Sequence, residues 1–126
     1  MFGEDPEKSP DYSRIVNDFH TSRLERLIKT AGGKIICGGK VNKETRYVAP
    51  TVILEPDKDS EVMTDEIFGP IMPVYTYSDF SEAINFINSK DKPLTVHYFG
   101  GRGSANERRL ANETYSGHFN TNDMIN

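Results

Sequence analysis

Short apolar runs and segments of helical periodicity alternate along this chain, and this alternation restricts its fold more than any other feature. The strand-like runs lie at residues 34–37, 46–54, 71–77, 94–99 and 117–121. One helical segment precedes the first run, with a candidate cap at Ser9-Pro10. Two more lie between later runs, with candidate caps at Ser78 to Ser81 and at Ser104. Strands separated by helices of about ten residues form parallel βαβ units. The sequence therefore predicts an α/β fold built from βαβ units, with a mainly parallel sheet.

Local residue patterns refine this prediction at both ends of the chain. Ser9-Pro10 predicts the start of a first helix, and its apolar positions recur at helical spacing: Ile15, Val16, Phe19, Leu24, Leu27 and Ile28. Pro50 interrupts the run at 46–54, so this strand needs an edge position or a bend. Ser104 predicts the start of a last helix that ends near Glu113.

The composition excludes several classes of protein. The chain has 126 residues, 36% of them hydrophobic and 27% charged, as in one globular domain or part of one. A net charge of −4 with both signs mixed argues against a nucleic-acid partner or a membrane surface. No apolar run approaches the ~20 residues of a membrane helix. An acidic N-terminus and a single cysteine indicate a reducing, cytoplasmic location.

Cys37 is the only thiol that could act as a nucleophile. A catalytic thiol needs a neighbouring base or a positive field, and no histidine lies near Cys37 in the sequence. Free cysteine is among the most frequently buried residue types, and Cys37 follows Ile35 and Ile36. The pattern predicts a buried, unreactive cysteine in a strand.

Two other patterns invite a binding interpretation. The loop Gly100 to Ser104 joins a strand to a helix, which is the arrangement of a phosphate cradle, but Asn106 stands where a third glycine is needed. A βα turn is the favoured interpretation. The three histidines, His20, His97 and His118, lack the spacing of a metal site and are interpreted as solvated or core-edge residues.

The segment Met63 to Pro70 carries the strongest functional signal. It places Glu66 next to an aromatic residue, Phe68, just before the backbone break at Gly69-Pro70. A carboxylate can accept two hydrogen bonds from a vicinal diol such as a ribose, and an aromatic ring can lie against a planar heterocycle. The alternative is a surface acid and a core phenylalanine.

Five motifs, in the same order and spacing, resemble the class 3 aldehyde dehydrogenases. They are Tyr12 to Asn17, Gly38-Gly39 with Thr45 to Val52, Val62 to Pro73, Glu82 to Asn88 with Lys92 to Leu94, and Glu113 to Gly117 with Asn122-Asp123. Each motif is modestly specific, and the ordered set is strongly specific. Within it, His118 replaces the second glycine of the family's "SGG".

The resemblance implies an enzyme that oxidises an aldehyde to a carboxylic acid with NAD⁺ or NADP⁺ through a cysteine thioester, and that forms a homo-oligomer. It implies that Glu66 holds the nicotinamide ribose and that Phe68 lies near the nicotinamide. It also implies that Ile125 forms part of the wall of the aldehyde tunnel.

The resemblance also implies what the chain lacks. Residues 1–126 match a C-terminal part of the catalytic domain, without the dinucleotide-binding half and without the nucleophile segment. We therefore expect the isolated chain to be inactive. Two alternatives remain: a non-catalytic binding or scaffold protein that reuses the fold, and a truncated gene product.

Overall fold

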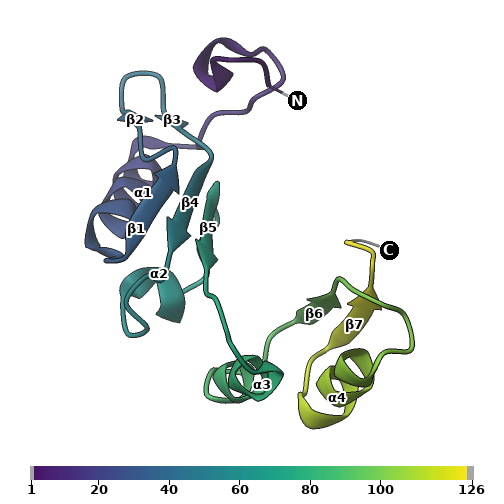
Figure 1. Cartoon of the computed structure of the whole chain (residues 1–126). Helices are drawn as coiled ribbons and strands as arrows, with labels where there is room; N and C mark the ends of the chain where they lie inside the picture. The colour runs from purple at the N-terminus through teal and green to yellow at the C-terminus, as the bar shows by residue number, and fades with distance from the viewer. Residues whose placement is uncertain (1, 125–126) are drawn as a thin grey trace. The chain divides into compact units, whose positions relative to one another are not determined.

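The computed structural model describes residues 2–124 and separates into two compact units, with the boundary between Thr76 and Tyr77 (Figure 1). The first unit contains a short 3-10 helix η1 (Pro6–Lys8), helix α1 (Asp18–Thr30), helix α2 (Glu61–Thr64) and five strands. The strands are β1 (Lys34–Cys37), β2 (Val41–Asn42), β3 (Tyr47–Val48), β4 (Thr51–Leu54) and β5 (Ile71–Val74). The second unit contains α3 (Phe80–Asn88), β6 (Thr95–Tyr98), α4 (Ala105–Glu113) and β7 (His118–Thr121).

The first unit is built on a three-stranded sheet of order β1-β4-β5. β4 pairs with β5 in parallel, and β1 pairs with β4 antiparallel. Thr51 and Ile53 of β4 are buried, and Ile53 packs in one cluster with the apolar face of α1. The buried members of this cluster are Leu24, Leu27, Ile28, Ala31, Val48, Ile53, Val62 and Ile71. Helix α1 therefore supplies Leu24, Leu27 and Ile28 to this core, and its C-cap residue is Ala31.

The second unit is a βαβ unit with one additional helix. β6 and β7 pair in parallel, and α4 connects them. Ile84 of α3, Val96 of β6 and Leu110 of α4 form its buried core. Ser104 caps α4 by accepting a hydrogen bond from the Glu107 backbone N–H at 3.1 Å. The predicted helix from Ser104 to about Glu113 is thereby confirmed.

The predicted α/β class with parallel βαβ units is also confirmed. The segments β4-α2-β5 and β6-α4-β7 are both parallel βαβ arrangements. Two antiparallel pairings accompany them, namely β1 with β4 and the hairpin β2-β3. β2 was not among the predicted strands, and the predicted strand at 46–54 is divided at Pro50 into β3 and β4.

The predicted start of the first helix is wrong. Helix α1 begins at Asp18, and Asn17 caps it by accepting from the His20 backbone N–H at 2.9 Å. Ile15 is not helical because its backbone N–H donates to the Arg46 carbonyl at 3.0 Å. A long-range contact with the hairpin thus removes the first predicted turns, and Val16, predicted on the apolar face, is exposed.

The prediction that Cys37 is buried is also wrong. β1 is an edge strand, and all four of its residues are exposed. The core forms on the side of the sheet that faces α1, and β1 contributes no buried residue to it. Cys37 is therefore a free, exposed thiol.

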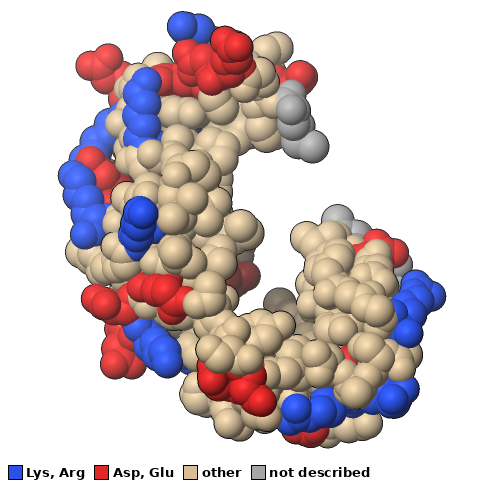
Figure 2. Space-filling view, in the orientation of Figure 1, with Lys and Arg blue, Asp and Glu red and all other residues tan. Residues whose placement is uncertain are grey.

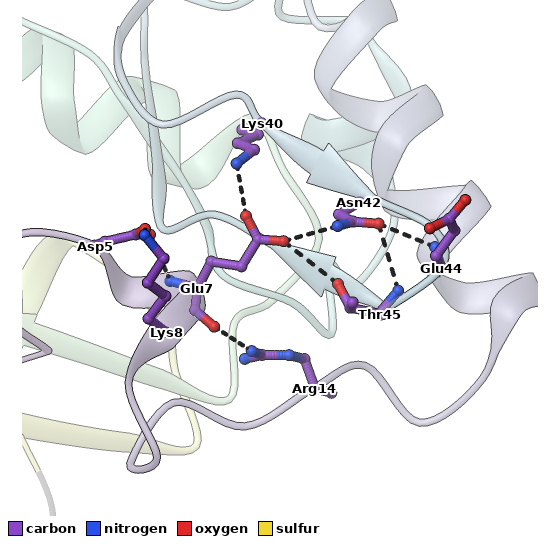
Figure 3. A network of polar contacts seen from close by, with 8 residues as sticks. All are labelled: Asp5, Glu7, Lys8, Arg14, Lys40, Asn42, Glu44 and Thr45. Carbon is purple, nitrogen blue, oxygen red and sulfur yellow. Dashed lines mark hydrogen bonds and ion pairs between the residues drawn. The ribbon is translucent and has the colours of Figure 1, made fainter.

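A polar network attaches the N-terminal segment to the hairpin (Figure 3). The Glu7 carboxylate accepts hydrogen bonds from Lys40 at 2.6 Å and from Asn42 at 2.8 Å. The hydrogen bond from Lys40 is the largest cause that lowers the pKa of Glu7, followed by the bond from Asn42. The backbone of η1 is thereby held beside the turn of β2-β3.

Charged side chains of both signs are interspersed on the face drawn in Figure 2, and acidic and basic groups often adjoin each other. Ion pairs of the chain include Arg26 with Glu61 and Lys43 with Glu25. None of the helices within residues 2–124 is long and apolar enough to cross a membrane.

Candidate functional site

Glu66 and Phe68 lie in an exposed loop between α2 and β5. Both side chains are exposed, and 73% of the surface of Phe68 is accessible. Phe68 has a φ of +45°, in the left-handed region that residues with a Cβ rarely adopt. An exposed aromatic residue in this conformation is unusual, and strained backbone of this kind concentrates at binding sites. Within the described residues, Phe68 belongs to neither of the two core clusters.

The loop backbone is held from α1 on the N-terminal side of Phe68. Nη2 of Arg23 donates to the Ile67 carbonyl at 2.5 Å, and Nη1 makes a longer contact of 3.5 Å with the Glu66 carbonyl. Both contacts join residues more than forty positions apart in the sequence. The positive charge of Arg23 is therefore directed at the backbone of the loop.

The loop is held again on the C-terminal side of Phe68. A Cβ placed on Gly69 would lie 2.4 Å from Cδ2 of Leu24, which is completely buried. The next residue, Pro70, accepts a hydrogen bond from the Thr51 backbone N–H at 2.8 Å, where the parallel pairing of β4 and β5 begins. Glycine is required at position 69 because the backbone approaches the core here without space for a side chain.

This geometry leaves the Glu66 carboxylate available to a ligand. Within residues 2–124 it forms no ion pair and no side-chain hydrogen bond, although Arg23 contacts its backbone carbonyl. A carboxylate in this position can accept hydrogen bonds from two hydroxyl groups, and Phe68, two residues away, offers an exposed ring face.

Asn122 directly follows β7 and belongs to the last of the five motifs. Asn122 has a φ of +55°, and its side-chain amide both accepts from the Gly100 N–H and donates to the Gly100 carbonyl, each at 2.9 Å. Asn122 therefore joins the loop after β6 to the end of β7. The predicted tunnel residue, Ile125, lies outside the described residues.

The loop Gly100 to Ser104 is a βα turn. The Gly103 backbone N–H donates to the carboxylate of Glu107, whose other oxygen accepts from Thr121 Oγ1 at 2.6 Å. These contacts lower the pKa of Glu107, with the Thr121 hydrogen bond as the largest cause. The Gly103 N–H, which a bound phosphate would need as a donor, is thus already hydrogen-bonded to the Glu107 carboxylate.

A cavity of about 500 Å³ lies beside this turn. It is lined by Arg102, Gly103, Glu107, Phe119, Asn120, Thr121 and Asp123.

The histidines of the second unit contact an asparagine and the backbone. His97 lies opposite Asn120 across the parallel pair, and its Nδ1 is 2.9 Å from the Asp123 carbonyl. His118 begins β7, and its Nε2 is 2.9 Å from Oδ1 of Asn120. Among residues 2–124, no cluster of three or more histidine, cysteine or acidic side chains is arranged to hold a metal ion.

Sequence reasoning missed Arg23, Leu24 and Asn122 as residues that shape these loops. Arg23 lies on a helix rich in charged residues, and its spacing carries no signal that distinguishes it from Arg26. Only its contact with the loop, which joins distant parts of the chain, identifies it.

Comparison with known proteins places these features in a family. Aldehyde dehydrogenase family 3 member A2 of Mus musculus is 45% identical over 125 residues, which are 99% of this chain and 25% of that protein. A protein of Canis lupus familiaris described as "Aldehyde dehydrogenase, dimeric NADP-preferring" is 42% identical, over 99% of this chain and 27% of its own length. The substrate-bound structure of Staphylococcus aureus AldH superposes with a TM-score of 0.88 at 38% identity, over 98% of this chain and 27% of that one.

The chain spans about a quarter of the length of the curated relatives that it matches. Residues 2–126 match the profile of the aldehyde dehydrogenase family. The resemblance inferred from the five motifs is thus confirmed over nearly the whole sequence, and the chain belongs to the aldehyde dehydrogenase family.

Proposed function

We propose that this chain supplies the nicotinamide end of the cofactor site in an enzyme that oxidises aldehydes to carboxylic acids with NAD⁺ or NADP⁺. One observation carries the proposal: Glu66 and Phe68 are both exposed on a loop whose backbone is held on either side of Phe68. When bound, the cofactor accepts a hydride from the substrate. The contribution of Glu66 and Phe68 is to hold its ribose and nicotinamide in a reactive position.

The test is substitution of Glu66 in the full-length protein that carries this segment. Glu66→Gln should weaken cofactor binding or slow hydride transfer by about 1–3 kcal/mol, the value of a lost charged hydrogen bond. Asp65→Asn is the matched control, because this acid precedes Glu66 in the same loop and is also exposed. Equal kinetics for wild type and Glu66→Gln would remove Glu66 from the site.

We further propose that residues 1–126 are a C-terminal part of the catalytic domain and that they are inactive alone. Cys37 lies exposed on an edge strand and does not match the motif of the family's nucleophile. Purified chain should therefore not oxidise an aldehyde in the presence of NAD⁺ or NADP⁺. Activity that disappears in a Cys37→Ser variant would contradict this proposal.

Location and assembly are proposed on the same basis. A free, exposed thiol at Cys37 is typical of a reducing compartment, which supports a cytoplasmic location. The relative from Canis lupus familiaris is described as dimeric, which supports a homo-oligomer for the full-length protein. Cell fractionation and light scattering of the full-length protein would test the two proposals separately.

A further inference from the structure

Arg23 is the described residue that most directly controls the backbone of the Glu66 loop. It projects from α1 and is half-buried, and its guanidinium contacts two consecutive carbonyls, those of Glu66 and Ile67. The contact with the Ile67 carbonyl is a hydrogen bond from a charged donor, which is stronger than one between neutral groups. A planar guanidinium can address two acceptors in fixed directions, whereas a lysine ammonium acts as a point charge.

The loop needs such support because of Phe68. A residue with a Cβ in the left-handed region is less stable by about 1–2 kcal/mol, and surrounding contacts must compensate for this. Arg23 holds the carbonyls immediately before Phe68, and Leu24 packs against Gly69 immediately after it. Two adjacent residues of α1 therefore hold the strained residue from both sides.

The same contacts keep the carboxylate of Glu66 available. The donors of Arg23 that reach this loop contact backbone carbonyls, and the Glu66 side chain forms no ion pair within residues 2–124. A salt bridge between these two side chains would instead compete with a ligand for the carboxylate oxygens.

We propose that Arg23 is a positioning residue for the cofactor, because it fixes the backbone at Glu66 and Ile67 so that Glu66 and Phe68 face the nicotinamide ribose. This inference rests on the proposed cofactor role of Glu66 and Phe68. Arg23 acts through the loop and does not touch the cofactor.

The test compares two arginines one turn apart on α1 in the full-length protein. Arg23→Ala should raise the KM for NAD⁺ or NADP⁺ about tenfold, the effect of losing one charged hydrogen bond, and leave the aldehyde KM unchanged. Arg23→Lys should restore part of the loss, because it retains the charge without the planar fork. Arg26→Ala is the control, since Arg26 donates to the Glu61 carboxylate at 2.6 Å and 3.0 Å and does not contact the loop carbonyls.

Hydrogen exchange provides the second measurement. Arg23→Ala should accelerate exchange in the peptide that covers residues 65–70, while the peptide that covers β4 exchanges as in the wild type. Arg26→Ala should leave residues 65–70 unchanged. If Arg23→Ala does not fold, Arg23→Lys carries the same test, with a smaller expected rise in the cofactor KM.

Two results would overturn the inference. One is an unchanged cofactor KM in both Arg23 variants while Glu66→Gln impairs cofactor use, which leaves the proposed function intact. The other is an equal rise in the KM of cofactor and aldehyde with faster exchange throughout α1, which indicates general destabilisation. A silent Glu66→Gln substitution would instead contradict the proposed function itself.

Discussion

Both units contain a parallel strand pair joined by a crossover, but only the first unit uses its crossover to present a candidate binding loop. Between β4 and β5, the helical part of the connection is confined to Glu61–Thr64, and the exposed loop with Glu66 and Phe68 follows it. Between β6 and β7, the connection is mainly α4, which spans Ala105–Glu113 and buries Leu110. The first crossover presents the candidate binding loop, and the second consists mainly of a helix that packs in the core.

The difference follows from where each unit obtains the helix that covers its sheet. In the first unit, α1 precedes the sheet in the sequence and contributes Leu24, Leu27 and Ile28 to the core. The β4-β5 crossover adds only Val62 of α2 to the buried members of this core. In the second unit, α4 is itself the crossover and must pack on β6 and β7. With α1 in place, the β4-β5 connection retains an exposed segment that carries Glu66 and Phe68.

The largest expected effect tests whether the two cores are separate. Leu24→Ala should lower the free energy of unfolding of the first unit by roughly 2–5 kcal/mol, because Leu24 is completely buried. Amide exchange in residues 77–124 should remain as in the wild type. Leu110→Ala should produce the reverse pattern, and faster exchange of both units in both variants would contradict the comparison.

The next effect tests the contact between the loop and α1. Gly69→Ala should destabilise the first unit by about 1–3 kcal/mol, because the added methyl group overlaps the buried Leu24 side chain. Gly101→Ala is the control in the second crossover, where the nearest atom to an added Cβ is 3.8 Å away. Chemical denaturation measures both variants, and equal stabilities would argue against a tightly held loop.

A smaller effect, of opposite sign, tests whether Phe68 is retained for function. Phe68→Gly should stabilise the first unit by about 1 kcal/mol, because glycine accepts a φ of +45° and the ring is mostly exposed. The same variant should weaken cofactor binding in the full-length protein. Phe99→Gly is the control, since Phe99 is also exposed but is not among the positive-φ residues. A loss of stability in Phe68→Gly would show that strain at this position is unimportant.

The smallest effect concerns pH. Glu25 on α1 accepts from Lys29 at 2.9 Å and pairs with Lys43 of the hairpin turn at 2.7 Å, and hydrogen bonds from these lysines lower its pKa from 4.5 to about 2. Because the folded-state pKa is depressed, its contribution is present above pH 4.5 and is lost as the pH falls towards 2.

Thermal unfolding midpoints measured across this pH range should show a decline in the wild type that is smaller in Glu25→Gln. Glu113 provides the comparison in the second unit, because its partner Arg109 lies on the same helix. Glu113→Gln should therefore leave the attachment of α1 to the hairpin unaffected. Identical pH profiles for wild type and Glu25→Gln would contradict this role of Glu25.

The accuracy of the sequence predictions follows the range of the interactions involved. The start of α4 was predictable because the Ser104 cap is a local signal. The bend at Pro50 was predictable because proline cannot continue a central strand. The start of α1 was not predictable, because the bond between Ile15 and Arg46 joins distant residues. The exposure of Cys37 depends on the order of strands in the sheet, which its apolar neighbours do not encode.

The sequence by itself determined the family, the α/β class and the position of the Glu66-Phe68 motif, because each depends on residue types in a fixed order along the chain. The tertiary structure alone decided that both side chains face solvent and that Arg23 and Leu24 hold the loop between them. The physical reason is that exposure and backbone support depend on contacts between residues more than forty positions apart, which local periodicity and capping do not specify.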